Sequence, residues 1–311
     1  MSANSEANTV PETPESRRGF AMCLMIACST VISFGGLIIR NIEEADAWQM
    51  NFYRSVSIIG AVSIILVFQY RKQTINHIRK IGRPGLLGGA LLSIAGIAFI
   101  QALTHTTVAN ALFTMSAIPF ITAGLARIFL GEHLQKITVI TMIVAALGVF
   151  VMVAESVEIG LAYGNVMALV TAISFSCFTV IVRHNRGVDM LPTLLVSGVI
   201  IGSIALIVRA DDLGVPIKDI LLCFLWGGVL SGFANWAFIT ATRYLVAAEV
   251  TLFMLLEFAL GPMWVWLFVG ETPTKGTLIG GTLVIVAVIV FSAYELRRTG
   301  RTLKRGRPSP G

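Results

Sequence analysis

Two stretches decide the fold: residues 109–132, ANALFTMSAIPFITAGLARIFLGE, and residues 247–271, AAEVTLFMLLEFALGPMWVWLFVGE. They can be laid over each other with an offset of 138 residues at the start and 139 at the closing Gly-Glu pair, so one residue is inserted between. Each is long and apolar enough to cross about 30 Å of hydrocarbon as a helix. Chance similarity of two apolar stretches is the alternative, but the match favours two related halves.

The composition places most side chains in lipid. Apolar residues make up 56% of the 311 residues and charged residues only 13%, whereas a soluble domain carries about a quarter charged residues. Four cysteines fall inside apolar stretches without a CxxC pair or a Cys/His cluster, so neither a disulfide framework nor a metal site is indicated. The sequence excludes a soluble globular protein.

Uninterrupted apolar runs between charged and turn residues predict ten helices, and so an all-α polytopic membrane protein. The expected spans are 20–39, 47–69, 85–103, 108–130, 137–154, 161–182, 191–208, 218–241, 246–269 and 276–295. They divide the chain into a disordered cytoplasmic tail at 1–17, five-helix halves at 18–156 and 157–296, and a basic cytoplasmic tail at 297–311.

The basic residues predict the orientation. With the N-terminus inside, 18 of the 23 Lys and Arg fall on the cytoplasmic side, four on the other side, and Arg54 within a span. The positive-inside rule therefore predicts that both termini are cytoplasmic. This topology explains the net charge of +6 without a nucleic-acid partner.

The number of spans in each half suggests a function. Because five is odd, the second half is inverted in the membrane relative to the first. Inverted repeats are typical of transporters, in which two equivalent halves rock about a site near the middle of the membrane.

The chain resembles the EamA-type family of the drug/metabolite transporter superfamily. The matching segments are Phe52–Arg54, Ala111–Pro119, Gly131-Glu132 and Leu256–Glu271, and the resemblance covers about residues 18–296. The family pattern usually has Pro directly after the Leu-Glu of the ninth span, where this chain has Phe258 and then Pro262. We therefore expect the kink of this helix to be displaced.

Ionisable groups inside spans are the first candidates for a binding site, since each is costly unless it faces protein or water. Arg54 lies about 10 Å inside the second span at 1.5 Å per residue. Glu257 lies near the middle of the ninth, and Glu249 closer to its cytoplasmic end. We expect Glu257 to bind a proton or a cationic group of the solute, and Arg54 to bind an anionic group or lock a gate. The alternative is an ion pair that only ties helices together.

Neutral polar residues complete the candidate substrate site. They are Ser33, Gln101, Asn110, Asn235 and Trp236. Buried amides need partners, so they are expected to face the interior of the bundle.

Other side chains are assigned to structure. Tryptophans near the outer ends of spans are interpreted as anchors at the membrane interface; they are Trp48, Trp226, Trp264 and Trp266. Glycines spaced four apart, such as Gly198 and Gly202, indicate close helix packing.

Enzymatic activity is not expected. There is no GxxxxGK[ST] loop, and no Asp or His lies in the interior of a predicted span, Asp219 being at the very start of one, so ATP hydrolysis and intramembrane hydrolysis have no candidate residues. No catalytic residue, metal or cofactor is predicted.

The sequence thus predicts a bacterial inner-membrane secondary transporter that moves small organic metabolites, such as amino acids or related compounds, by alternating access. Its expected partners are a small-molecule substrate and the lipid bilayer, and a homodimer is an open alternative to a monomer. Two alternatives remain: an uptake carrier for a larger metabolite or vitamin, such as riboflavin or S-adenosylmethionine, and a membrane protein with a structural or receptor role that transports nothing.

Overall fold

A computed structural model describes residues 14–106, 108–153, 162–210, 212–270 and 274–305, and every regular element among them is helical. The elements of the first half are α1 (Pro14–Ile32), α2 (Gly35–Asn41), α3 (Ala47–Tyr70), η1 (Arg71–Gln73), α4 (Thr74–Lys80), α5 (Gly82–His105), α6 (Val108–Met115), α7 (Ile118–Leu130) and α8 (Lys136–Val153). Those of the second half are α9 (Ala162–His184), α10 (Thr193–Val208), α11 (Ile217–Phe224), η2 (Leu225–Ser231), α12 (Gly232–Ala241), α13 (Ala247–Phe253), α14 (Leu255–Val269) and α15 (Lys275–Arg305).

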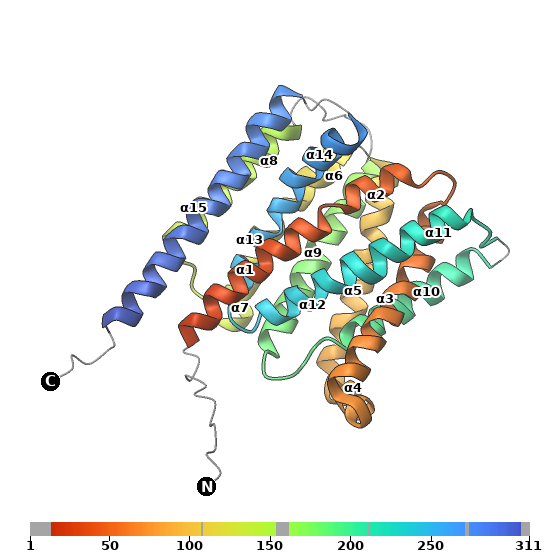
Figure 1. The fold of residues 1–311 in the computed structure, drawn as a ribbon, viewed down its shortest axis with the longest axis horizontal. Helices are drawn as coiled ribbons and strands as arrows, with labels where there is room; N and C mark the ends of the chain where they lie inside the picture. Colours follow the sequence, from red (N-terminus) through yellow and green to blue (C-terminus); the bar gives the residue numbers. More distant parts are fainter. Residues whose placement is uncertain (1–13, 107, 154–161, 211, 271–273, 306–311) are drawn as a thin grey trace, which may run out of the picture.

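The chain is a multi-pass membrane protein. Eight helical segments of the described chain are long and apolar enough to cross a membrane, and two further apolar helices, α8 and α10, are shorter. These ten segments correspond to the ten expected spans. The start of α1 and the end of α15 lie at the same end of the bundle (Figure 1), which we call the tail end, and the opposite end is called the far end.

The contacts between helices follow a two-fold pattern. Helix α5, the third expected span, packs against α9 and α10 of the second half. The eighth expected span is its equivalent and contains α12, which packs against α1, and η2, which packs against α3. The pairs α3 with α10 and α8 with α15 join equivalent helices of the two halves, and α7 with α13 joins the second part of the fourth span to the first part of the ninth. In Figure 1, α8 and α15 lie side by side along one edge of the molecule. Helices of each half are therefore packed against helices of the other half.

The Gly-Glu pairs of the repeat have equivalent structures at their glycines. Gly131 ends α7 with φ 64°, and Gly270 ends α14 with φ 78°. Both are left-handed helix C-caps, a conformation that glycine adopts without steric penalty. The structure therefore supports the repeat between residues 109–132 and 247–271.

Three of the expected spans are broken near their middles. The first breaks at Ser33-Phe34, the fourth at Ser116-Ala117 and the ninth at Met254. Pro119, which has no N–H, explains the second break. The expected displacement of the kink in the ninth span is wrong, because α14 runs on through Pro262 and the break lies at Met254.

The predicted tails need correction. Helix α1 begins at Pro14, so residues 14–17 are helical, and residues 1–13 lie outside the described chain. Helix α15 continues to Arg305, nine residues into the predicted C-terminal tail. The predicted boundary between the halves, 156/157, lies outside the described residues.

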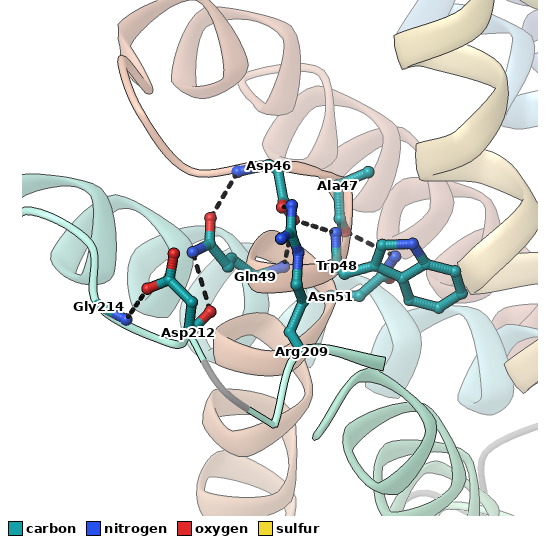
Figure 2. Close-up of polar contacts among 8 residues, drawn as sticks. All are labelled: Asp46, Ala47, Trp48, Gln49, Asn51, Arg209, Asp212 and Gly214. Atoms are coloured by element: carbon teal, nitrogen blue, oxygen red, sulfur yellow. Dashed lines mark hydrogen bonds and ion pairs between the residues drawn. The ribbon is translucent and has the colours of Figure 1, made fainter. Parts of the chain in front are cut away.

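Polar contacts at the far end fix the start of α3 (Figure 2). Asp46 caps the helix by accepting hydrogen bonds from the N–H groups of Trp48 and Gln49, at 2.8 and 2.9 Å, and it pairs with Arg209 beyond α10. The Gln49 side-chain amide donates to the Asp212 carbonyl at 3.2 Å. Residues from the two halves are thereby joined at this end.

A second contact of this kind involves Asp219 in the first turn of α11. Its carboxylate is fully buried and accepts hydrogen bonds from the N–H groups of Glu43, Glu44 and Ala45, at 3.3, 2.9 and 3.0 Å. Three backbone donors satisfy the buried charge, so the α2–α3 loop is held against α11.

Candidate functional site

A cavity of about 530 Å³ lies between the two halves. Most of its walls are apolar, with aromatic side chains that include Phe99, Phe175 and Phe238. Its polar lining includes Ser33, Asn51, Arg54, Ser55, Thr171, Ser197, Ser231, Asn235 and Glu257. A mainly apolar pocket with a few convergent polar groups is the usual form of a small-molecule site.

The cavity reaches the surface at one end of the bundle. Among its described lining residues only Gly36, Arg40 and Thr274 are exposed. Gly36 and Arg40 belong to α2, and Thr274 precedes α15, so all three lie at the far end. The structure is thus open at the far end and closed at the tail end.

Arg54 is held in the cavity wall by an aromatic ring. Its guanidinium carbon lies 3.7 Å from the centre of the Trp226 ring, and Trp226 is 2% exposed. Glycines make room for this stack: a Cβ on Gly35 would lie 2.8 Å from the indole nitrogen, and one on Gly227 would lie 2.5 Å from the Arg54 carbonyl oxygen. The prediction that Trp226 anchors the protein at the membrane interface is wrong.

Arg54 and Glu257 have no ion-pair partner among the described residues. Arg54 Nε is buried without a hydrogen bond. Among the described residues, no hydrogen bond or ion pair engages the Glu257 carboxylate, although Arg54 and Glu257 line the same cavity. They do not form the ion pair that was the structural alternative. Groups of opposite charge therefore line one cavity without pairing with each other.

Ser33 lies at the break between α1 and α2. It donates to the Thr30 carbonyl at 2.7 Å and accepts from the Trp264 indole N–H at 2.8 Å. The Trp264 ring stacks on Phe34 with centroids 4.4 Å apart. Trp264 is therefore bound inside the bundle, and its prediction as an interface anchor is also wrong.

The remaining candidates are divided between cavity and structure. Asn235 lines the cavity and donates to the Ser231 carbonyl at 2.8 Å. Gln101 is buried outside the lining, and Trp236 is half-buried and packs on the main core. Asn110 lies in the first turn of α6, and its side chain is outside the described part of the chain.

Glu249 has a different environment from Glu257. It is 2% exposed and pairs with Arg18 at 2.7 Å, and it does not line the cavity. Arg18 is not among the predicted site residues, because its position near the start of the first span places it with the basic residues of the cytoplasmic side.

A second tail-end ion pair was likewise missed. Arg183 Nε donates to Glu132 at 2.7 Å and its Nη1 to the Thr242 carbonyl at 2.7 Å. Glu132 also accepts from the Ala247 N–H, the first residue of α13, at 3.1 Å. The Glu of the first Gly-Glu pair thus caps a helix of the other half. In the sequence, only the repeated Gly-Glu pair pointed to Glu132.

Comparison with known proteins identifies the family. A model of the EamA-like transporter family matches residues 19–154 and again residues 162–293. The chain belongs to the EamA-like transporter family. The two matches coincide with the two halves of this EamA protein, so its architecture is two repeats around a shared cavity.

Characterised relatives are transporters as well. A pseudopaline exporter, CntI, of Pseudomonas aeruginosa is 25% identical over 279 residues, which is 86% of this chain and 94% of the exporter. A riboflavin transporter of Rhizobium johnstonii is 23% identical over 67% of this chain and 70% of its own. A crystal structure with a TM-score of 0.74 and 16% identity covers 89% of this chain and 98% of its own, and shows the same fold. The EamA protein is thus a transporter of the drug/metabolite type.

Proposed function

We propose that this EamA protein carries small zwitterionic organic solutes, such as amino acids or related compounds, by alternating access through the cavity. The observation that carries the proposal is the presence of Arg54 and Glu257 in one largely apolar cavity without an ion pair between them. A solute with an anionic and a cationic group would pair with both. A buried charge left without a partner is costly, so binding such a solute is favourable.

Each part of the cavity has a role in this proposal. The guanidinium of Arg54, oriented by Trp226, binds a carboxylate with two parallel N–H donors. Glu257 binds an ammonium group. The aromatic walls bind the apolar part of the solute, since burial of apolar surface is favourable and not directional.

We further propose that the protein lies in a bacterial inner membrane with both termini in the cytoplasm. The 18 basic residues on the tail side against four on the far side support this orientation. The conformation described above is then open to the outside and closed to the cytoplasm. No enzymatic step is part of the proposal.

Solute flux tests the function. Purified protein in proteoliposomes is expected to accumulate or exchange members of a panel of radiolabelled amino acids. Arg54→Gln and Glu257→Gln are each expected to reduce the flux at least tenfold. Glu44→Gln, an exposed acid at the far end, is the matched control and keeps wild-type flux.

Three results would contradict the proposal. Flux of a neutral or singly charged solute alone would reject the zwitterion. Flux of riboflavin or another larger metabolite would favour the uptake alternative. Wild-type flux in both cavity variants would remove these charges from the site.

Two roles are proposed for Glu257, and the pH dependence of transport distinguishes them. If it carries a proton during transport, Glu257→Gln keeps solute exchange and loses pH-dependent net transport. If it is a fixed charge for an ammonium group, the same variant loses binding at every pH.

A further inference from the structure

The tail end of the cavity is closed by a buried cluster of three charged residues from three helices: Arg18 on α1, Glu249 on α13 and Glu295 on α15. Arg18 Nη2 lies 2.7 Å from Glu249 Oε1 and 3.0 Å from Glu295 Oε2. Both glutamates are 2% exposed. A single guanidinium nitrogen therefore holds two buried carboxylates together.

The cluster has unmet bonding capacity. Glu249 Oε2 and Glu295 Oε1 are buried without a hydrogen-bond partner, as is Arg18 Nε. Arg298, whose side chain is 55% exposed, approaches Glu295 Oε1 at 3.8 Å, beyond hydrogen-bond reach. The two buried carboxylates share one close guanidinium, and the exposed Arg298 forms a longer ion pair with Glu295. A proton on either acid removes one of the two buried negative charges.

Other charged and titratable groups with described side chains lie near the cluster. These groups lie in the tail-end halves of the packed helices and in the adjoining turns. On the helices they are Arg17 and Cys23 on α1, Arg127 on α7, Lys136 on α8, Arg183 and His184 on α9, and Tyr294, Arg297 and Arg298 on α15. In the turns they are Glu132, His133, Arg186, Asp189, Arg243 and Tyr244. Glu132 is held by Arg183, and Arg243 by Asp189. Arg17 lies over the Tyr244 ring at 5.9 Å.

An apolar layer separates the cluster from the cavity. Met22, Met25, Phe253 and Phe291 are each at most 1% exposed, and the two phenylalanine rings meet with centroids 6.0 Å apart. Ser29 lies farther along α1 from the tail end than Met22 and Met25, and its hydroxyl donates to the Phe253 carbonyl at 2.8 Å. A solute leaving the cavity toward the tail end would have to part both this layer and the charged cluster.

We propose that Arg18, Glu249 and Glu295 form a proton-binding gate: a proton shared by the two carboxylates stabilises the closed tail end, and its release to water lets the acids separate as that end opens. The state that binds the proton is populated more as the pH falls. One coupled proton changes the ratio of closed to open states by at most about tenfold per pH unit. This inference uses the alternating access of the proposed function, and its test needs no solute.

The test follows opening through a buried thiol. Ser29→Cys is placed in a variant in which Cys23, Cys28, Cys177 and Cys223 are replaced, because Ser29 is fully buried and lies three helical turns from Arg18 on the same face of α1. Its labelling rate with N-ethylmaleimide in membrane vesicles is measured from pH 5.5 to 8. At each pH the rate is divided by that of Asn76→Cys, an exposed position on α4, which cancels the intrinsic pH dependence of the thiol.

The normalised rate is expected to rise at least threefold across this range. Glu249→Gln and Glu295→Gln each remove one buried carboxylate charge and keep an acceptor for Arg18, so both variants are expected to give a low rate without pH dependence. Arg18→Gln is expected to raise the rate. Glu43→Gln, at the exposed far-end pair with Lys218, is expected to keep the rise.

The proposal is overturned if the parent shows no rise, or if both glutamine variants keep it. Elution from size-exclusion chromatography checks that each variant is folded. If Arg18→Gln does not fold, Arg18→Lys replaces it, and a labelling rate below that of the parent would then count against the gate. Loss of zwitterion flux with an intact pH response would reject the proposed solute and leave the gate standing.

Discussion

Replacing Gly227 by alanine should loosen the contact between the two halves beside Arg54. A Cβ at this position would lie 2.5 Å from the Arg54 carbonyl oxygen and 2.9 Å from its Cα. Both are backbone atoms of α3, so the clash cannot be relieved by a side-chain rotation. Overpacking costs about 1–3 kcal/mol, and the rigid backbone places this case near the upper value. Alanine recovers about 1 kcal/mol of helix propensity, which leaves a net loss of about 2 kcal/mol.

The measurement is the midpoint of thermal unfolding in detergent, with solute flux as a second assay. For a chain of 311 residues, a loss of about 2 kcal/mol corresponds to a midpoint lowered by about 3 °C. Gly232→Ala is the matched control, because its Cβ would meet its nearest neighbour at 3.5 Å, an ordinary contact. The control is expected to be neutral or slightly more stable. Equal midpoints and equal flux for the two variants would refute the argument that η2 depends on a close backbone approach at Arg54.

Three further predictions concern charge. In a cysteine-free background, Glu43→Cys should react with a membrane-impermeant maleimide in intact cells and Asn76→Cys should not; the reverse would reject the proposed orientation. Arg54→Lys keeps the charge but loses the flat guanidinium, so flux should fall at least tenfold, and wild-type flux would exclude two-point binding. Glu132→Ala leaves the charge of Arg183, whose side chain is 9% exposed, without its acidic partner, which should cost about 3–5 kcal/mol. The exposed control Glu43→Ala should cost about 0–1 kcal/mol, so similar midpoints for the two would contradict the burial argument.

The helices were predictable because lipid imposes a single strong rule, that a span is long and apolar. The second span, expected at 47–69, is Ala47–Tyr70 in the structure. The breaks inside spans were not predictable in the same way. A proline breaks the hydrogen bond to the carbonyl four residues before it, but the residue four after Met254 is Phe258. The π-helical segment η2 brings Gly227 into close contact with the backbone of α3. Such features depend on which neighbour a helix meets.

The candidate site shows the same division. The cost of charge in lipid selected Arg54 and Glu257, and both line the cavity. Trp226 was assigned to the interface because position along a helix reveals its depth and not the face it occupies. Arg18 and Glu295 escaped selection because charges near span ends ordinarily reach water, whereas here Glu295 is 2% exposed and bonded across helices.

The repeat and the charges have separate consequences for transport. By the offset of the two stretches, Glu257 corresponds to Pro119 or Ile118 of the first half, depending on where the inserted residue is placed. Ile118 lines the same cavity, so the two-fold relation brings a carboxylate and an apolar side chain to equivalent walls. A zwitterion rotated about that axis would place its ammonium group against Ile118, where it would be desolvated without a partner. In the proposed mechanism, the symmetry of the helices would let the halves exchange conformations, while the asymmetry of the charges would fix a single orientation for the solute.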